Sequence, residues 1–386
     1  MRSSTKIAIV HDWLTAPGGA ERVLEQLLRL YPAADLFCIC DFLDAKHRSL
    51  LCGRTPKTSF IQTLPWASKK HWMYLALMPL AIEQFDLSEY DLIISSSYAV
   101  AKGVLTGPEQ LHISYVYTPI RYAWQLQHQY LKEMKMDAGP LSWMVRIFLH
   151  YLRIWDLRSA VGVDRFISIS EYVARQVRKL YNVESEVLHP PVDLARFSLY
   201  EDKEHFFITA SRLVPYKRID LIVSAFAAMP QHRLVVIGDG PERKRVDAAA
   251  KGYSNIEIMG YQSDEVLRDL VSRAKAFVFA AIEDFGIAPL EAQASGTPVI
   301  ALARGGALET IRPIDSDHPT GVFFADQTEA SLIDAVAVFE REGHRILPKD
   351  CRSNAERFSA QTFGQRFSLI VEQAIVNDGR ITTTTP

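Results

Sequence analysis

The stretch EDFGIAPLE at residues 283–291 decides the fold of this chain. The apolar run at 275–281 before it is typical of a buried strand. Pro289 suits the first turn of a helix, because its missing N–H costs nothing there. The sequence therefore predicts a strand that ends near Glu283 and a helix whose first turn contains Glu291.

Two carboxylates at this position indicate a ligand site. In open α/β sheets, ligands bind outside the carboxyl ends of the strands. The free N–H groups at the start of a helix favour anions. Glu283 and Glu291 beside such donors therefore suit a ligand with hydroxyls at one end and phosphates at the other.

Strand and helix patterns alternate along all 386 residues, a length that exceeds one ordinary core. The expected strands lie at 6–11, 91–95, 112–117, 165–170, 206–210, 233–238, 256–260, 275–281 and 297–301. We therefore predict an α/β protein with two Rossmann-like domains, whose parallel sheets face a central cleft. Prolines and a charged run at 189–204 mark the linker, which gives domains at 1–200 and 204–358.

Composition excludes several classes. A net charge of −2 argues against a general nucleic-acid binder, whose affinity rests on phosphate neutralisation. The spacing of the four cysteines matches neither a zinc site nor a disulfide framework. The first residues lack the apolar core of a signal peptide, and no run reaches the ~18 apolar residues of a spanning helix. We expect a cytoplasmic protein, which could lie peripherally on the inner face of the cytoplasmic membrane.

Two cations follow a predicted strand of the second domain. Arg212 comes directly after the strand at 206–210, and Lys217 lies near the start of the next helix. A guanidinium fork and an ammonium suit a diphosphate. The alternative, a solvated surface pair, is disfavoured by their position after a strand.

Two glycine turns accompany these residues, at 238–240 and at 305–306. Glycine lets the backbone approach a ligand closely, but it also simply makes turns. At 305–306 the sequence leaves open whether the pair supplies N–H donors or only a loop.

The first domain offers a second group of candidates. Gly18 and Gly19 open the first helix without forming a dinucleotide fingerprint, and they fit backbone approach to phosphate. His11 at the end of the first strand suits proton transfer, although a His–Asp pair such as His11 with Asp12 is usually structural. Tyr117 and Arg121 lie in an aromatic loop that suits either sugar binding or simple packing.

Residues 66–74 mix aromatic and basic side chains. That composition is typical of a membrane interface. The alternative is a helix packed on the core with one solvated face.

Together these motifs resemble the large retaining glycosyltransferase family with the GT-B fold, of the group 1 or family four type. The motifs that carry the resemblance lie at 211–217, 238–241, 283–286 and 291–298. The stretches at 18–22, 117–124 and 189–193 are similar to a bacterial mannosyltransferase subgroup of polysaccharide assembly.

The resemblance implies a role for each candidate residue. It implies a nucleotide-diphospho-sugar donor with Arg212 and Lys217 on the diphosphate and Glu291 on the ribose. Glu283 would contact the donor sugar, and the catalytic set would be Arg212, Lys217 and Glu283. The remaining donor contacts would be the backbone of Asp284, Phe285, Gly286 and Ile287, and Gly18 and Gly19 from the first domain. His11, Tyr117 and Arg121 would lie near the sugar or acceptor.

The resemblance also implies the partners. No metal and no other cofactor are expected, because the two cations and N–H groups would stabilise the departing phosphate. The expected donor is GDP-mannose and the acceptor is a polysaccharide or lipid-linked glycan. A UDP-sugar donor, or a non-catalytic nucleotide- or glycan-binding protein, is the alternative. An anionic membrane surface is a further expected partner. Nucleic acid is not expected to bind.

Two further points concern particular segments. The C-terminal helix pattern at 361–378 is expected to pack back on the first domain, as in the family. Many relatives have histidine where this chain has Tyr117, and tyrosine is a poor base near neutral pH.

Overall fold

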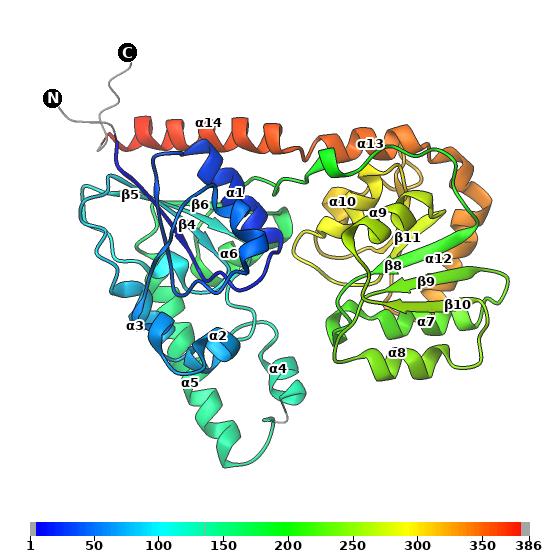
Figure 1. Cartoon of the computed structure of the whole chain (residues 1–386), viewed down its shortest axis with the longest axis horizontal. Coiled ribbons are helices and arrows are strands. Elements are labelled where there is room, and N and C mark those ends of the chain that lie inside the picture. The colour runs from blue at the N-terminus through cyan, green and yellow to red at the C-terminus, as the bar shows by residue number, and fades with distance from the viewer. Residues whose placement is uncertain (1–4, 135, 380–386) are drawn as a thin grey trace. The chain divides into compact units, whose positions relative to one another are not determined.

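The computed structural model describes residues 5–134 and 136–379 (Figure 1). Its contacts divide into two compact units, Met1–Pro190 with Phe363–Pro386, and Pro191–Thr362. The first crossing between units therefore lies at residues 190–191, ahead of the predicted domain limits at 200 and 204.

Within the described residues, unit 1 contains a seven-stranded sheet in the order β3-β2-β1-β4-β5-β6-β7. All of its strand pairs are parallel. Its strands are β1 (Ile7–His11), β2 (Asp35–Cys38), β3 (Lys57–Thr58), β4 (Leu92–Ser97), β5 (Leu111–Val116), β6 (Arg165–Ser168) and β7 (Glu186–Val187). The strand order reverses between β1 and β4, as in the Rossmann fold.

The helices of unit 1 form where the sequence has an apolar stripe at helical spacing. In the first helix Val23, Leu24, Leu27 and Leu28 are buried, and the other face is polar. The helices are α1 (Gly19–Leu30), α2 (Ala67–Lys70), α3 (Met78–Glu83), α4 (Gln127–Glu133), α5 (Pro140–Ala160), α6 (Glu171–Tyr181) and α14 (Ala360–Asp378).

Unit 2 repeats this topology. Over the part of the chain that the structure describes, it has a six-stranded parallel sheet in the order β10-β9-β8-β11-β12-β13. Its strands are β8 (Phe206–Ala210), β9 (Arg233–Ile237), β10 (Ile256–Gly260), β11 (Ala276–Phe279), β12 (Val299–Leu302) and β13 (Gly321–Phe324).

Helices cover both faces of the sheet in unit 2. Phe206 and Phe207, adjacent in β8, belong to two different apolar clusters, because successive side chains of a strand point to opposite faces. The helices are α7 (Ile219–Ala227), α8 (Arg243–Ala250), α9 (Asp264–Arg273), α10 (Ile287–Ala294), α11 (Ala307–Thr310), α12 (Glu329–Glu342) and α13 (Pro348–Glu356). Burial on both faces explains the continuous apolar runs of these strands.

The predicted α/β class with two Rossmann-like sheets is confirmed. Each of the nine strands expected from sequence overlaps an observed one. The sequence did not predict β2, β13 or the two-residue strands β3 and β7.

The C-terminal helix α14 contacts unit 1 through aromatic rings. Phe363 lies edge-on to Tyr115 at 5.7 Å between ring centroids, and Phe367 lies 6.3 Å from Tyr31. Arg366 also donates to the backbone oxygen of Val187 at 3.3 Å. From Phe363 onward, α14 is thereby part of unit 1.

No helix among residues 5–134 and 136–379 is both long enough and apolar enough to cross a bilayer.

His112 in β5 gives the fold a dependence on pH. Its Nδ1 lies 3.1 Å from the backbone oxygen of Gly162, which can only accept, so Nδ1 carries the proton. Its Nε2 accepts from the Ser95 hydroxyl at 2.8 Å, so the ring is neutral. Burial lowers the pKa of His112 to about 4.

We expect His112 to weaken the fold in acid. The unfolded histidine has a pKa of about 6.5, so the unfolded state binds the proton more readily. Its contribution is complete above pH ~6.5 and is lost as pH falls towards about 4. Urea unfolding at several pH values measures this, and His112→Gln is expected to flatten the dependence. The same pH dependence in wild type and variant would show that another group causes it.

Candidate active site

The sheet of unit 2 reverses its strand order between β8 and β11. At such a point the loops leave in opposite directions and open a crevice at the carboxyl ends of the strands. Arg212 follows β8, Lys217 closes a 3-10 turn over Pro215–Lys217, and Glu283 follows β11. The three predicted catalytic residues therefore leave adjacent strands at the reversal.

Lys217 and Glu283 are in direct contact. The Lys217 ammonium pairs with the Glu283 carboxylate, and each side chain is 17% exposed. The Lys217 nitrogen also lies 5.9 Å from the ring centroid of Phe279, the last residue of β11. The structure thus brings together two predicted residues from different strands, in a partly desolvated position.

Arg212 differs from Lys217 in its surroundings. It is exposed, and among the described residues no ion pair to its guanidinium is found. Its backbone is fixed, since its carbonyl oxygen accepts from the Val214 N–H at 2.9 Å. The edge of the sheet at the strand reversal therefore holds one paired cation and one exposed cation.

The glycine turn at 238–240 supports the segment that carries Arg212. A Cβ on Gly238, whose φ is +132°, would lie 1.8 Å from the backbone oxygen of Ser211. A Cβ on Gly240 would lie 2.4 Å from the backbone oxygen of Leu213. This turn packs backbone against backbone, which only glycine allows.

The glycine pair at 305–306 supports the loop that carries Glu283 in the same way. A Cβ on Gly305 would lie 2.4 Å from the backbone oxygen of Glu283, and one on Gly306 would lie 2.3 Å from the Cα of Phe285. The Gly306 N–H donates to the Glu283 carbonyl at 2.8 Å. The sequence left open whether this pair donates N–H groups to a ligand or only forms a loop. The N–H of Gly306 is used within the loop.

The start of α10 presents backbone to the crevice. Gly286 is its N-cap, with φ +88°, and makes no side-chain cap. Asp284 and Phe285 have buried side chains, and the Phe285 ring packs on Phe358 at 5.6 Å. What these residues and Ile287 can offer a ligand is therefore N–H groups at a helix start.

The predicted place of Glu291 is wrong by one turn. α10 begins at Ile287, two residues before Pro289, because Gly286 adopts the left-handed conformation and ends the loop there. Glu291 therefore lies in the second turn, where it shares the helix face of Ile287. It is half-buried.

In unit 1 the predicted residues cluster at the corresponding reversal, between β1 and β4. His11 at the end of β1 pairs in register with Ser96 of β4, and its Nδ1 lies 3.0 Å from the Ser96 hydroxyl. The Ser96 hydroxyl lies 2.8 Å from the Tyr117 hydroxyl. Tyr117 in turn donates to the backbone oxygen of Ala20 at 3.1 Å.

The carbonyl at the end of this chain fixes its direction. Because Tyr117 donates to a carbonyl, Ser96 donates to Tyr117 and the His11 Nδ1–H donates to Ser96. The other ring nitrogen, Nε2, is buried, lies 3.7 Å from Glu21 Oε1 and has no hydrogen-bond partner among the described residues. Burial raises the pKa of Tyr117 well above its usual value, so its phenol stays protonated.

Asp12 has a structural role. Its carboxylate accepts four backbone N–H groups, from residues 98–101, at 2.5–3.0 Å. Burial is the main influence on this carboxyl, and it raises its pKa. Asp12 therefore shapes the loop after β4, and His11 is the member of the pair that faces Ser96 and Glu21.

Gly18 and Gly19 begin α1. Gly18 is the N-cap and makes no side-chain cap, whereas Ser170, Ser263 and Thr328 cap α6, α9 and α12 with a side-chain oxygen. A Cβ on Gly18 would lie 2.8 Å from Glu21 Oε2. The pair thus leaves a helix start with backbone donors, beside a carboxylate.

The aromatic loop after β5 combines both predicted roles. Arg121 is half-buried, and its Nε donates to the Thr118 hydroxyl at 3.4 Å. Ile120 and Ala123 are buried in the core, and Trp124 donates to Asp156 at 2.7 Å. The end of the loop therefore packs on the core. Its start carries Tyr117 and Arg121, the two residues predicted to lie near the sugar.

Sequence reasoning missed Glu21 and Ser96. Glu21 lies one turn beyond Gly18, so the glycine pair itself pointed to it. Ser96 belongs to the serine run 95–97 at the end of β4, a polar end to an apolar strand. Polar residues at the end of an apolar strand were the sequence signal that could have identified Ser96.

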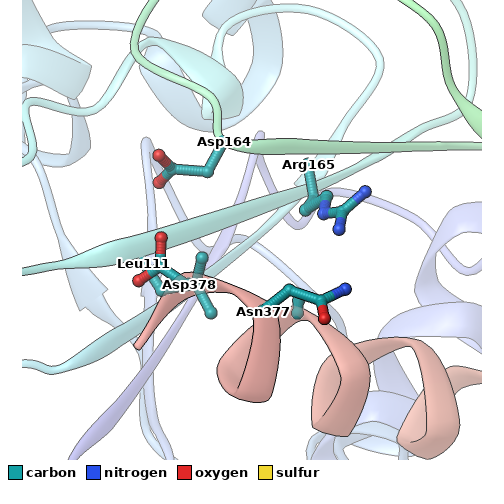
Figure 2. A pocket seen from close by; sticks show the side chains of 6 residues that line it. Leu111, Asp164, Arg165, Asn377 and Asp378 are labelled. Carbon is teal, nitrogen blue, oxygen red and sulfur yellow. The ribbon is translucent and has the colours of Figure 1, made fainter. Parts of the chain in front are cut away.

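One pocket lies away from these groups. It has a volume of about 160 Å³ and is lined by Leu111, Asp164, Arg165, Ala374, Asn377 and Asp378 (Figure 2). Leu111 and Arg165 are the first residues of β5 and β6, so the pocket is at the amino ends of the strands. Ligands of this topology bind at the other edge.

Within the described ranges, no group of three or more His, Cys, Asp or Glu side chains is arranged to hold a metal ion.

Two family models cover most of the chain. Residues 17–196 match the model described as Glycosyltransferase Family 4, and residues 193–358 match Glycosyl transferases group 1. The models meet at the predicted linker and include every candidate residue except His11.

Curated relatives are distant. The chain is 28% identical to sulfoquinovosyl transferase SQD2 of Arabidopsis thaliana, over 74% of this chain and 57% of that protein. It is 29% identical to a GDP-mannose-dependent phosphatidylinositol monomannoside mannosyltransferase of Corynebacterium glutamicum, over 39% of this chain and 47% of that protein. The chain thus spans about half the length of these relatives.

Solved structures share the architecture. Anabaena HepE, crystallised in complex with UDP, superposes with a TM-score of 0.69 over 96% of this chain and 100% of its own, at 16% identity. At that identity the similarity concerns the fold, and it confirms the GT-B class.

Proposed function

Because this chain belongs to the glycosyltransferases of the group 1 and family 4 type, we propose that it transfers a hexosyl residue from a nucleotide-diphospho-sugar to a glycan. The proposed donor is GDP-mannose, and the acceptor is a polysaccharide or a lipid-linked oligosaccharide. The mannosyltransferase relative from Corynebacterium glutamicum supports this donor.

The contact between Lys217 and Glu283 at the strand reversal carries the proposal. A cation and a carboxylate at one crevice match the two ends of the donor, phosphates and sugar hydroxyls. On donor binding, the Lys217 ammonium and the Arg212 guanidinium would hold the diphosphate, while Glu283 would accept from sugar hydroxyls. The N–H groups at the start of α10 would add neutral donors.

The proposed reaction keeps the anomeric configuration. The bond from the anomeric carbon to the diphosphate oxygen breaks, and a bond to the acceptor oxygen forms on the same face. The acceptor's proton goes to the departing phosphate, so no protein base is needed. A protonated Tyr117 fits this scheme, because a neutral phenol cannot take a proton and the scheme needs no protein base.

We propose that no metal or other cofactor takes part. The charge that develops on the departing phosphate needs positive groups, and Arg212 and Lys217 supply two of them.

Two alternatives remain distinct from this proposal. A UDP-sugar donor is favoured by the UDP complex of Anabaena HepE. A non-catalytic nucleotide- or glycan-binding protein would keep the crevice without turnover.

Thermal unfolding with a panel of nucleotides tests the donor. A ligand that binds only the folded state raises the apparent stability by about 2.7 kcal/mol at one hundred times its dissociation constant. GDP and GDP-mannose are expected to raise the melting temperature, with ADP as the control. A shift with UDP alone would favour the alternative donor, and no shift with any nucleotide would contradict the proposed donor site.

A prediction separates the two glutamates. Glu291→Gln is expected to weaken GDP binding about tenfold or more, because it would lose a charged hydrogen bond to the ribose. Glu283→Gln is expected to leave GDP affinity unchanged or higher, since it frees Lys217 for the diphosphate, while transfer falls. Calorimetry with GDP measures both affinities. An equal loss of affinity in both variants would refute the division of roles.

We also propose that the chain works at the inner face of the cytoplasmic membrane. Residues 66–74 were predicted either to contact membrane or to pack on the core. Trp66, Trp72 and Met73 are 69%, 58% and 51% exposed, and Lys69 and Lys70 are exposed beside them. That exposure supports the membrane alternative.

A further inference from the structure

Helix α5 is apolar on two opposite faces. One face packs on the core of unit 1 through Leu149, Leu152 and Trp155. The other face carries six large apolar residues that are 46–71% exposed. We call this set the α5 stripe: Trp143, Met144, Ile147, Tyr151, Ile154 and Leu157.

The stripe is continuous along the helix. Its members follow one another at spacings of one, three or four residues, which places them on one side of an α-helix. With 21 residues, α5 is about 30 Å long. A long exposed apolar face on a helix indicates a surface that a partner covers.

Polar contacts hold the C-terminal half of the helix. Figure 1 shows the N-terminal half of α5 extending beyond α2 and α3, away from the sheet of unit 1. The other half is held by Asp156, which pairs with the buried Lys102, and by Trp155, which donates to Glu83 of α3 at 2.7 Å. The stripe is therefore presented by a helix with a fixed base.

The charges on α5 select the partner. Its charged and titratable residues outside the core are basic, namely Arg146, His150, Arg153 and Arg158. Its one acidic residue, Asp156, is buried. A second copy of α5 would bring like charges together, whereas an anionic surface would meet basic groups alongside apolar ones.

The residue types fit an interface between water and lipid. Trp143 and Tyr151 have rings that combine an apolar body with a polar atom, as in the aromatic residues at membrane boundaries. Helices with an apolar face and basic flanks lie in the plane of such boundaries.

We propose that the α5 stripe docks the chain on an anionic phospholipid bilayer, with the helix lying in the headgroup region. This surface is separate from residues 66–74, and it does not depend on the identity of the donor. It goes beyond the transfer reaction, because it assigns the surface that holds unit 1 at the membrane.

Vesicle flotation of the full chain tests the proposal. The vesicles are phosphatidylcholine alone, or phosphatidylcholine with phosphatidylglycerol. The wild type is expected to float with the anionic vesicles. For the Ile147→Glu/Ile154→Glu variant, the fraction bound to these vesicles is expected to be at least tenfold lower. Val376→Glu is the matched control, because Val376 is 72% exposed on another helix of unit 1. It is expected to bind like the wild type, and circular dichroism checks the fold of each variant.

Other results would overturn the proposal. They are no flotation of the wild type with anionic vesicles, or equal flotation of the stripe variant. Loss of binding in Trp66→Ser/Trp72→Ser together with full binding of the stripe variant would place the contact at 66–74 instead. Sedimentation without lipid tests whether a second copy of the chain binds the α5 stripe. A wild-type dimer that the stripe variant abolishes, without vesicle binding, would assign the stripe to a second copy of the chain.

Discussion

Replacing Arg212 or Lys217 by alanine is expected to lower sugar transfer by about two to three orders of magnitude, as for loss of a preorganised donor to developing charge. Both residues follow β8 at the strand reversal, where the departing phosphate would lie. Steady-state transfer assays measure the effect. Lys244→Ala is the control, since Lys244 is an exposed lysine on α8 of the same unit. Near-normal turnover in both variants with an intact fold would remove these residues from the mechanism.

The two variants are expected to differ in stability. Lys217→Ala leaves the largely buried Glu283 carboxylate without its ammonium partner, and a buried charge without a partner is costly. Arg212 is exposed, so its removal costs the fold little. Urea unfolding is expected to show a lower free energy of unfolding for Lys217→Ala than for Arg212→Ala. The reverse order would contradict the pairing of Lys217 with Glu283.

Replacing Lys102 by alanine is expected to destabilise the fold by about 3–5 kcal/mol, the cost of breaking a buried ion pair by removing one partner. The Lys102 and Asp156 side chains are 2% and 0% exposed. Asp156 also accepts from Trp124 at 2.7 Å and from Tyr181 at 3.0 Å, so its charge is fixed in place. Without Lys102 this carboxylate stays buried without its cation.

Denaturant unfolding measures this loss, with a surface pair as the control. Arg178 and Glu184 pair with side chains 65% and 76% exposed. Arg178→Ala is therefore expected to leave the free energy of unfolding nearly unchanged. Equal effects of Lys102→Ala and Arg178→Ala would mean that burial of the Lys102 pair has no energetic consequence.

The sequence predicted the sheets well for a physical reason. Strands covered on both faces are continuous apolar runs, which is why 206–210 and 276–279 were found. β2 and β13 were missed although they are as long as β11, because β2 begins with the charged Asp35 and β13 with Gly321, residue types that are depleted in strands. For α5, periodicity alone cannot tell which of its two apolar faces is covered.

The candidate site was predicted in part. The carboxyl ends of adjacent parallel strands meet at one edge, so Arg212, Lys217 and Glu283 could be assigned to one crevice. The contact between Lys217 and Glu283 depends on loop conformations, which the glycine turns at 238–240 and 305–306 fix through backbone packing. Glu291 was misplaced because the left-handed Gly286 starts the helix earlier than Pro289 indicated.

The central claim, transfer with retention from a nucleotide sugar, is tested most directly by product analysis. The full chain is incubated with GDP-mannose and a lipid-linked oligosaccharide, and the product is examined by mass spectrometry and by NMR of the new anomeric centre. The account predicts an acceptor heavier by one hexose, an α linkage like that of the donor, and free GDP. A β linkage, or a folded protein that binds nucleotide sugars yet forms no product from GDP-mannose or UDP-sugars, would contradict it.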